Sequence, residues 1–114
     1  MDIGYDNGYI ASGQKRGKTM RESKIEAYLT ERTKNVLGGR ALKFLPYLMA
    51  GMPDRILLLP GGQVLWVETK APGEKLRPKQ KQRQRQLQEL GFYVAVIDSI
   101  EGVDLLIEAL RRRG

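Results

Sequence analysis

Residues 51–70 read Gly-Met-Pro-Asp-Arg-Ile-Leu-Leu-Leu-Pro-Gly-Gly-Gln-Val-Leu-Trp-Val-Glu-Thr-Lys, and this stretch decides the fold. Two apolar runs, 55–59 and 64–67, lie on either side of a Pro-Gly-Gly-Gln segment. Strand-like runs joined by a glycine-containing loop are typical of a β-hairpin. We therefore predict an antiparallel hairpin that brings the end of its second strand back beside Asp54.

The length of the hairpin loop decides which side chains share a face with Asp54. If two residues form the turn, Pro60 pairs with Gln63 and Asp54 points away from Glu68. If three residues form the loop, the parity changes and Asp54 shares a face with Glu68 and Lys70. We predict a three-residue loop, or a bulge of equal effect, because such loops with a left-handed glycine are common connections.

The composition limits the class of protein. A chain of 114 residues suits one compact domain. Its 20 Lys and Arg residues exceed its 13 Asp and Glu residues, and the net charge of +7 suits a polyanionic partner: nucleic acid first, an anionic membrane second. The absence of cysteine and histidine excludes disulfides, thiolate or imidazole metal sites and histidine bases. No apolar run is long enough to span a membrane, and the N-terminus has no secretory signal, so we expect a cytoplasmic protein.

Apolar residues at helical spacing, with proline or glycine near the ends, predict helices over 21–37, 78–90 and 103–113. Ser99 is a candidate N-cap for the last of them.

Two further strands are expected around the hairpin. Residues 40–47 are interpreted as a short strand ended by Pro46. Residues 92–98 form a continuous apolar run, as expected for a strand at the centre of a covered sheet. Residues 1–19 have no periodic apolar face, so we interpret them as a flexible arm that precedes a domain over 20–114.

The helix over 78–90 is unusually basic and rich in glutamine. Its inward stripe contains Leu76, Gln80, Arg83, Leu87 and Leu90, which places polar groups on the side that faces the hairpin. A polar boundary of the stripe is the simpler interpretation, and proximity to a polar site is the functional one. The candidate phosphate contacts are Lys75, Arg77, Lys79, Lys81, Arg83 and Arg85.

One acid of the first helix also needs an interpretation. Glu26 is adjacent to Ile25 and three residues before Leu29, at the edge of the apolar stripe. On its own, it is most simply a solvated helix residue. The alternative is an acid that points at the hairpin.

The hairpin brings together groups that suit phosphodiester chemistry. Asp54 and Glu68 are hard oxygen ligands of the kind that bind Mg²⁺ or Mn²⁺. Such a metal lowers the pKa of a bound water and binds the phosphate, and Lys70 could orient that water or stabilise the developing charge. Residue types alone leave a plain ion-pair cluster equally open.

The order Gly51-x-Pro53-Asp54, Glu68-x-Lys70, then Pro78-x-Gln80 and Gly91, preceded by a helical Glu26, resembles a known family. It is similar to the VRR-NUC group, the virus-type replication-repair nuclease domain of the PD-(D/E)XK nucleases, from about residue 20 to residue 110.

This resemblance implies an α/β fold with a restriction-endonuclease-like core, a mixed β-sheet flanked by α-helices. It implies Asp54, Glu68 and the backbone carbonyl of Thr69 as metal ligands, with Lys70 catalytic. Glu26 would hold a second metal or a water beside it, and Gln80 would lie next to Lys70. Single-domain members resemble phage proteins, which implies a homodimer that cuts branched DNA such as four-way junctions.

Two other classes compete with a metal-dependent DNA nuclease. A non-catalytic nucleic-acid-binding module would explain the charge of +7 and the basic helix. It would not explain two acids at one strand end, because acids repel phosphate unless a metal intervenes. A structural phage protein, with the acids and Lys70 in an ion-pair cluster, would bind no Mg²⁺.

Overall fold

The structure is a computed structural model that describes residues 20–45 and 49–113. The predicted arm over 1–19 lies outside the described residues. The helices and strands, in chain order, are α1 (Met20–Leu37), β1 (Arg40–Lys43), β2 (Arg55–Leu59), the 3-10 turn η2 (Pro60–Gly62), β3 (Gln63–Thr69), α2 (Pro78–Glu89), β4 (Tyr93–Ile97) and α3 (Ile100–Arg113).

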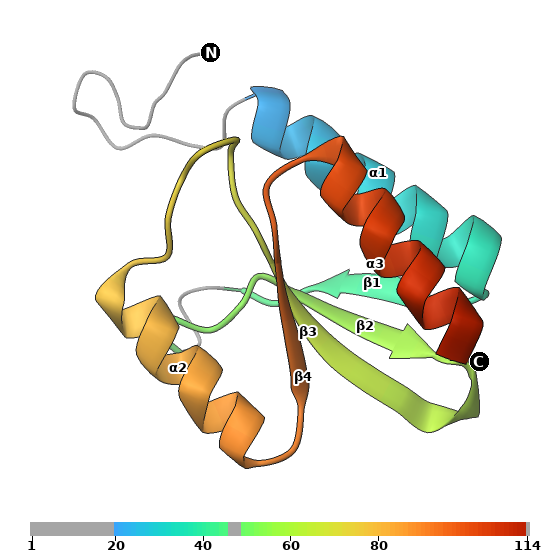
Figure 1. Cartoon of the computed structure of the whole chain (residues 1–114). Helices are drawn as coiled ribbons and strands as arrows, with labels where there is room; N and C mark the ends of the chain where they lie inside the picture. Colours follow the sequence, from blue (N-terminus) through green and yellow to red (C-terminus); the bar gives the residue numbers. More distant parts are fainter. Residues whose placement is uncertain (1–19, 46–48, 114) are drawn as a thin grey trace.

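The four strands form one mixed sheet in the order β1-β2-β3-β4. Strand β2 is antiparallel to both β1 and β3, and β4 runs parallel to β3 after the crossover through α2. Helices α1 and α3 lie side by side over one face of the sheet, and α2 lies on the other side, next to β4 (Figure 1). The predicted α/β fold with a mixed sheet flanked by helices is confirmed.

The main core lies between the sheet and the pair α1 and α3. Alternate residues of the hairpin, including Leu57, Leu65 and Val67, are buried there. Leu29 of α1 and Ile107 of α3 pack on the same cluster. Burial of one face of each hairpin strand fixes the register, because a shift by one residue would expose all of these side chains.

The hairpin has the predicted three-residue loop. Leu59 pairs with Gln63, so η2 is the whole connection. Gly61 and Gly62 have φ angles of 81° and 79°, the left-handed region that favours glycine. This loop length fixes which residues of β2 and β3 lie opposite each other, as far as Asp54, which lies just before Arg55, the first residue of β2.

The position of β4 differs from the prediction. It pairs only with β3 and forms an edge of the sheet. Val94 and Ile97 are buried, whereas Tyr93 and Val96 are 51% and 42% exposed. A continuous apolar run shows that both faces of a strand have apolar side chains, but it does not show how many neighbours the strand has.

Three element ends also differ from the prediction. The strand over 40–47 ends as β1 at Lys43, and Pro46 lies outside the described residues. Helix α3 begins at Ile100 because Ser99 caps it, accepting the N–H of Gly102. Leu90, expected on the inward stripe, follows the end of α2 and is 75% exposed. Within the described residues, no helix has the length and apolar character that crossing a membrane requires.

Candidate active site

The side chain of Asp54 accepts hydrogen bonds from β3 just beyond the last residue pair of the hairpin. Val67 is the last residue of β3 whose partner lies within β2, and Thr69 lies beyond it. The Asp54 carboxylate accepts the backbone N–H of Thr69 at 2.8 Å and faces the Thr69 hydroxyl at 2.5 Å. A buried backbone N–H needs an acceptor, so this carboxylate replaces the missing strand partner. The position of Asp54 is thus held by the sheet itself.

A second carboxylate reaches the same hydroxyl from α1. Glu26 is only 6% exposed, and its Oε2 lies 3.0 Å from the Thr69 hydroxyl. The acid of the first helix therefore points at the hairpin rather than into solvent. One hydroxyl proton cannot be donated to two carboxylates at once. Burial raises the pKa of Asp54, and the neighbouring Glu26 raises it further against the opposing hydrogen bonds from Thr69.

Arg55 is a member of the site that the sequence analysis missed. Its guanidinium donates to Glu26 Oε1 at 3.0 Å, and the residue is 9% exposed. Arg55 alternates with Leu57 and Leu59, which are also buried, so hairpin parity was the signal that could have found it. A buried arginine paired with Glu26 fixes the direction in which that carboxylate points.

Glu68 and Lys70 form the second part of the site. Both are buried, with exposed fractions of 7% and 6%, and Lys70 Nζ lies 3.8 Å from Glu68 Oε2. Burial raises the pKa of the Glu68 carboxyl to about 8. The charge of Asp54 also raises it, and the ammonium of Lys70 opposes the shift. The pKa of Glu68 therefore depends on the charge of Asp54, so the two parts of the site are electrostatically coupled.

Gln80 connects α2 to Glu68 through its helix cap. Arg77 is the N-cap residue of α2 and Pro78 occupies its first turn. Gln80 Oε1 accepts the backbone N–H of Arg77 at 2.8 Å, and its Nε2 donates to Glu68 Oε2 at 3.2 Å. The cap fixes which end of the amide faces the site. This explains both the residue type and its spacing from the proline.

Gly51 lets the loop before Asp54 approach α2. A Cβ atom at Gly51 would lie 2.6 Å from the backbone oxygen of Lys79, and its φ is +81°. In the same loop, the Ala50 carbonyl accepts the Nε–H of Arg83 at 2.8 Å. The glycine of the Gly-x-Pro-Asp motif is therefore required by the close packing of this loop on α2.

The candidate phosphate contacts are arranged on and before α2. Lys75, Arg77, Lys79, Lys81 and Arg85 are exposed and have no salt bridge to a described residue. Arg83 differs, because it is partly buried and its guanidinium contacts Ala50 and Gln86. Its contacts hold α2 against the loop that carries Asp54.

The donor set fits a hard divalent cation. Glu26, Asp54 and Glu68 supply carboxylate oxygens from three elements, and two of these carboxyls have raised pKa values because they are buried near other acids. In the described part of the chain, no three acidic side chains are close enough together to hold one metal ion among them. Mg²⁺ does not need one, since it binds through one or two carboxylates and keeps several waters.

Comparison with known proteins places the chain in a family. Residues 7–101 match the VRR-NUC domain model, so the chain belongs to the VRR-NUC family. "Putative nuclease p44" of Acyrthosiphon pisum secondary endosymbiont phage 1 is 42% identical over 82 residues, which is 72% of this chain and 87% of the relative. The chain is thus a homologue of a phage protein named as a nuclease.

Two solved structures share the fold. One, described as a VRR_NUC domain, has a TM-score of 0.71 and 31% identity, covering 77% of this chain and 95% of the other. A second, described as a VRR_NUC domain protein, has a TM-score of 0.67 and 22% identity, covering 85% and 93%. The mixed four-stranded sheet flanked by helices is therefore the fold of this family.

The packing at Gly51 predicts a specific loss of stability. Gly51→Ala combines a strained positive φ with a collision against Lys79, whereas Gly73→Ala has a similar φ of +84° and open space around it. We expect Gly73→Ala to cost about 1 kcal/mol, and Gly51→Ala to cost roughly 1–3 kcal/mol more, in urea unfolding. Equal losses in the two variants would contradict the close approach of the loop to α2.

The raised pKa of Glu68 predicts that the metal-free protein loses stability as the pH rises. The folded state keeps the Glu68 proton up to a pKa of about 8, whereas the ordinary value is 4.5, so folding takes up a proton between these values. The melting temperature in EDTA should therefore fall by roughly 5–10 °C between about pH 5 and pH 8. Glu68→Gln should remove most of this slope; the rest reflects Asp54, whose raised pKa acts in the same direction. A wild-type melting temperature that rises over this window would refute the assignment.

Proposed function

We propose that this protein is a divalent-metal-dependent DNA endonuclease that hydrolyses phosphodiester bonds and selects branched DNA such as four-way junctions. The observation that carries the proposal is the local balance of charge: three acids, the buried Glu26 and Glu68 and the half-buried Asp54, lie with only two buried cations, Arg55 and Lys70. A structural ion-pair cluster would be balanced, because buried charge without a partner is costly. An additional half-buried acid beside these paired charges is what a cation-binding site requires.

The residues divide the work between them. Asp54, Glu68 and the backbone carbonyl of Thr69 would hold Mg²⁺ or Mn²⁺, and Glu26 would bind a second ion or a water beside it. The metal supplies a polarised water and a Lewis acid for the phosphate. Lys70 stabilises the negative charge that develops on the phosphate.

Gln80 contributes by keeping Glu68 in position through its hydrogen bond. The flanking phosphates contact the exposed cations Lys75, Arg77, Lys79, Lys81 and Arg85. Arg83 contributes only the part of its guanidinium that is not already bonded to Ala50 and Gln86. Because these cations lie on and before the helix that holds Gln80, DNA bound to α2 lies close to the acids.

Cleavage of a DNA panel tests the activity. The panel contains a four-way junction, a flap, a duplex and a single strand, each with Mg²⁺, Mn²⁺ or EDTA. We expect metal-dependent cutting by the wild type, fastest on the junction, and a loss of at least about 100-fold in Lys70→Met, which keeps the length of the buried side chain. Lys81→Ala, an exposed neighbour on α2, should weaken DNA binding without abolishing cutting.

The outcomes separate the classes of protein. Cutting retained in Lys70→Met, with circular dichroism showing a folded variant, would remove Lys70 from the chemistry. Salt-dependent DNA binding by the wild type without cutting in either metal would instead favour the non-catalytic binding module, for which the exposed basic side chains of α2 are sufficient.

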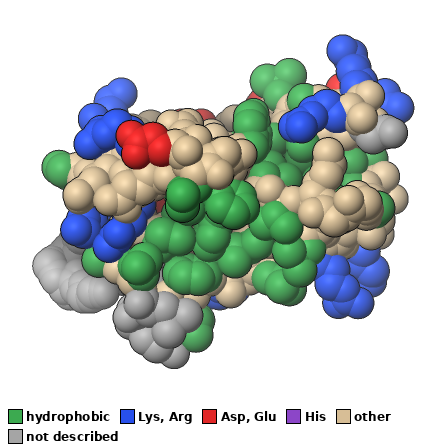
Figure 2. All heavy atoms as spheres, turned by 90° about the horizontal axis from the view of Figure 1, so that it is seen from below, with side chains coloured by type: hydrophobic (Ala, Val, Ile, Leu, Met, Phe, Trp, Pro, Cys, Tyr) green, Lys and Arg blue, Asp and Glu red, His purple; other side chains and the backbone are tan. Residues whose placement is uncertain are grey.

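We further propose that the active form is a homodimer. The sheet face opposite α1 and α3 is only partly covered by α2, and hydrophobic side chains gather on it (Figure 2). Strand parity puts Leu42, Leu58, Val64 and Val96 there, each 40–44% exposed. Trp66 is on the same face, and its buried indole nitrogen has no hydrogen-bond partner in the described structure.

The occupant best suited to this apolar face is a second copy of the chain. These apolar side chains can meet their own copies about a two-fold axis, with Arg40, which shares their face as the partner of Leu58, at the rim of the contact. A stable contact needs about 800 Å² per partner, which exceeds these exposed side chains alone and requires their surroundings as well. A two-fold pair presents two sites to the two strands that a junction enzyme must cut.

A charge placed in this face tests the dimer. Light scattering of the wild type should give twice the chain mass of 12.9 kDa, and Leu58→Glu should give the monomer with junction cutting reduced at least about tenfold. The control is Leu105→Glu, which changes a 74% exposed leucine of α3 on the other side of the sheet. A monomeric wild type, or a dimeric Leu58→Glu, would reject this interface.

A further inference from the structure

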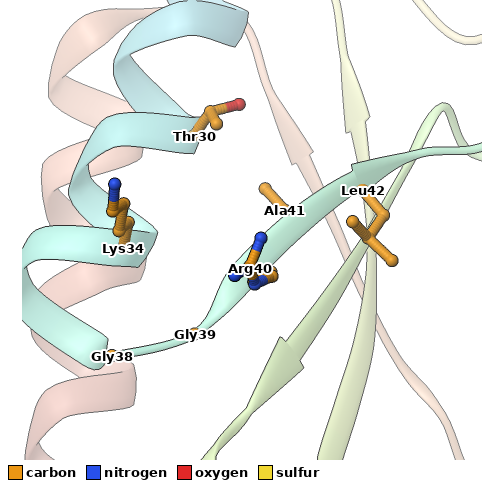
Figure 3. Close-up of a pocket in the computed structure, with 7 residues that line it drawn as sticks. All are labelled: Thr30, Lys34, Gly38, Gly39, Arg40, Ala41 and Leu42. Carbon is orange, nitrogen blue, oxygen red and sulfur yellow. The ribbon is translucent and has the colours of Figure 1, made fainter.

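A pocket outside the candidate active site lies between α1 and the outer edge of β1. Its volume is about 300 Å³, and it is lined by Thr30, Lys34, Gly38, Gly39, Arg40, Ala41 and Leu42 (Figure 3). Helix α2, with its exposed cations, is on the opposite side of the sheet (Figure 1). The pocket therefore lies outside the candidate active site and the basic surface of α2, and it adjoins the proposed dimer face at Leu42.

Two cations stand on the two walls of this pocket. Lys34 is in the last turn of α1, and Arg40 is the first residue of β1 (Figure 3). Both are exposed, and neither side chain has a salt bridge or hydrogen bond to another described residue. Cations that face one cavity repel each other unless an anion lies between them.

The backbone of β1 adds a donor on the same side. Phe44 donates its N–H to the backbone carbonyl of Asp54. Because backbone N–H groups alternate in direction along a strand, those of the even-numbered residues of β1 point toward β2. The N–H of Ala41 then points to the outer edge, where the pocket lies. Thr30 adds no donor, because its hydroxyl is bonded to the Glu26 carbonyl.

The C-terminus of α1 opposes an anion here, but weakly. A helix end has about half of a negative charge, and two full positive charges outweigh it. Moreover, the Thr33 and Lys34 carbonyls accept the N–H groups of Gly39 and Gly38. The electrostatic balance of the pocket therefore favours an anion.

The pocket is one short strand away from the candidate active site. Strand β1 runs from Arg40 to Lys43, whose partner Arg55 follows Asp54 in the chain. This length of strand spans about 10 Å, which equals about three nucleotide rises of a DNA strand. Along α1, Lys34 is two turns, about 12 Å, from Glu26. Lys43, exposed on β1, lies between the pocket and the acids.

We propose that this pocket binds a backbone phosphate of the DNA, about three nucleotides from the scissile bond and at the opposite edge of the sheet from α2. The proposal rests on the nuclease function for its substrate, but not on cleavage. The two basic regions, one on α2 and one at the α1–β1 edge, would hold the strand on both sides of the acids. The pocket then sets the direction in which the strand leaves the site.

The salt dependence of DNA binding tests this inference without any cutting. Binding of the four-way junction is measured in EDTA over a range of NaCl concentrations for the wild type and for Lys34→Ala/Arg40→Ala. The double variant should lower the slope of log K against log salt by about 1 to 2, because each phosphate contact contributes about 0.9. The control is Arg112→Ala/Arg113→Ala, which removes two exposed cations from the far end of α3.

A neutral phosphate locates the contact. Methylphosphonate linkages, placed one at a time along each arm of the junction, should at one or two positions weaken binding by the wild type about 5- to 20-fold and should barely affect Lys34→Ala/Arg40→Ala. Equal slopes in the Lys34/Arg40 variant and in the control, or methylphosphonate effects that are the same in both proteins, would overturn the proposal.

Two further outcomes are distinguishable. Inorganic phosphate or AMP that binds the wild type but not the double variant, with DNA binding unchanged by the substitutions, would make the pocket a site for small phosphates and overturn the DNA assignment. A wild type that shows the predicted slopes but never cuts DNA with Mg²⁺ or Mn²⁺ would remove the nuclease function and leave the pocket assignment intact.

Discussion

The shared environment of the Thr69 hydroxyl and its two acids is the constraint on which the rest of the structure depends. Asp54 and Glu26 reach this hydroxyl from the hairpin and from α1; Glu26 is buried and Asp54 is half-buried. Arg55 neutralises only part of this charge. Holding acids away from water in excess of nearby cations is unfavourable for a core, and the proposed cation site would explain why this arrangement is present.

The surrounding elements serve to hold that environment in shape. The three-residue loop of the hairpin sets the register that puts Asp54 at the end of β3. Helix α2 is then fastened to this end of the sheet at two points: Gly51 allows close contact with its first turn, and Gln80 uses one amide to cap the helix and bond Glu68. Motif residues that look like separate ligands are thus partly mechanical connections.

The sequence predicted which side chains gather at the end of the hairpin more completely than it predicted the edges of the sheet. Glu26, Asp54, Glu68, Lys70 and Gln80 occupy one region because strand parity and helix spacing are local rules that survive in the folded chain. The placement of β4 at the edge was missed, because the number of neighbours of a strand depends on the crossover through α2 rather than on its own residues. The family resemblance added what spacing alone could not, the connection of the first helix and of α2 to the hairpin.

By itself, the sequence determined the hairpin, its loop length, the helices and the grouping of acids with a lysine. These follow from short-range geometry: alternation along a strand, the φ angles that glycine permits, and the period of a helix. Only the tertiary structure decided that Arg55 pairs with Glu26 and that Lys34 and Arg40 line one pocket. It also decided that the Thr69 hydroxyl lies within hydrogen-bond distance of both Glu26 and Asp54. Those arrangements join elements distant in the chain, and their energies depend on burial and on the distances between charges, which no local pattern of residues contains.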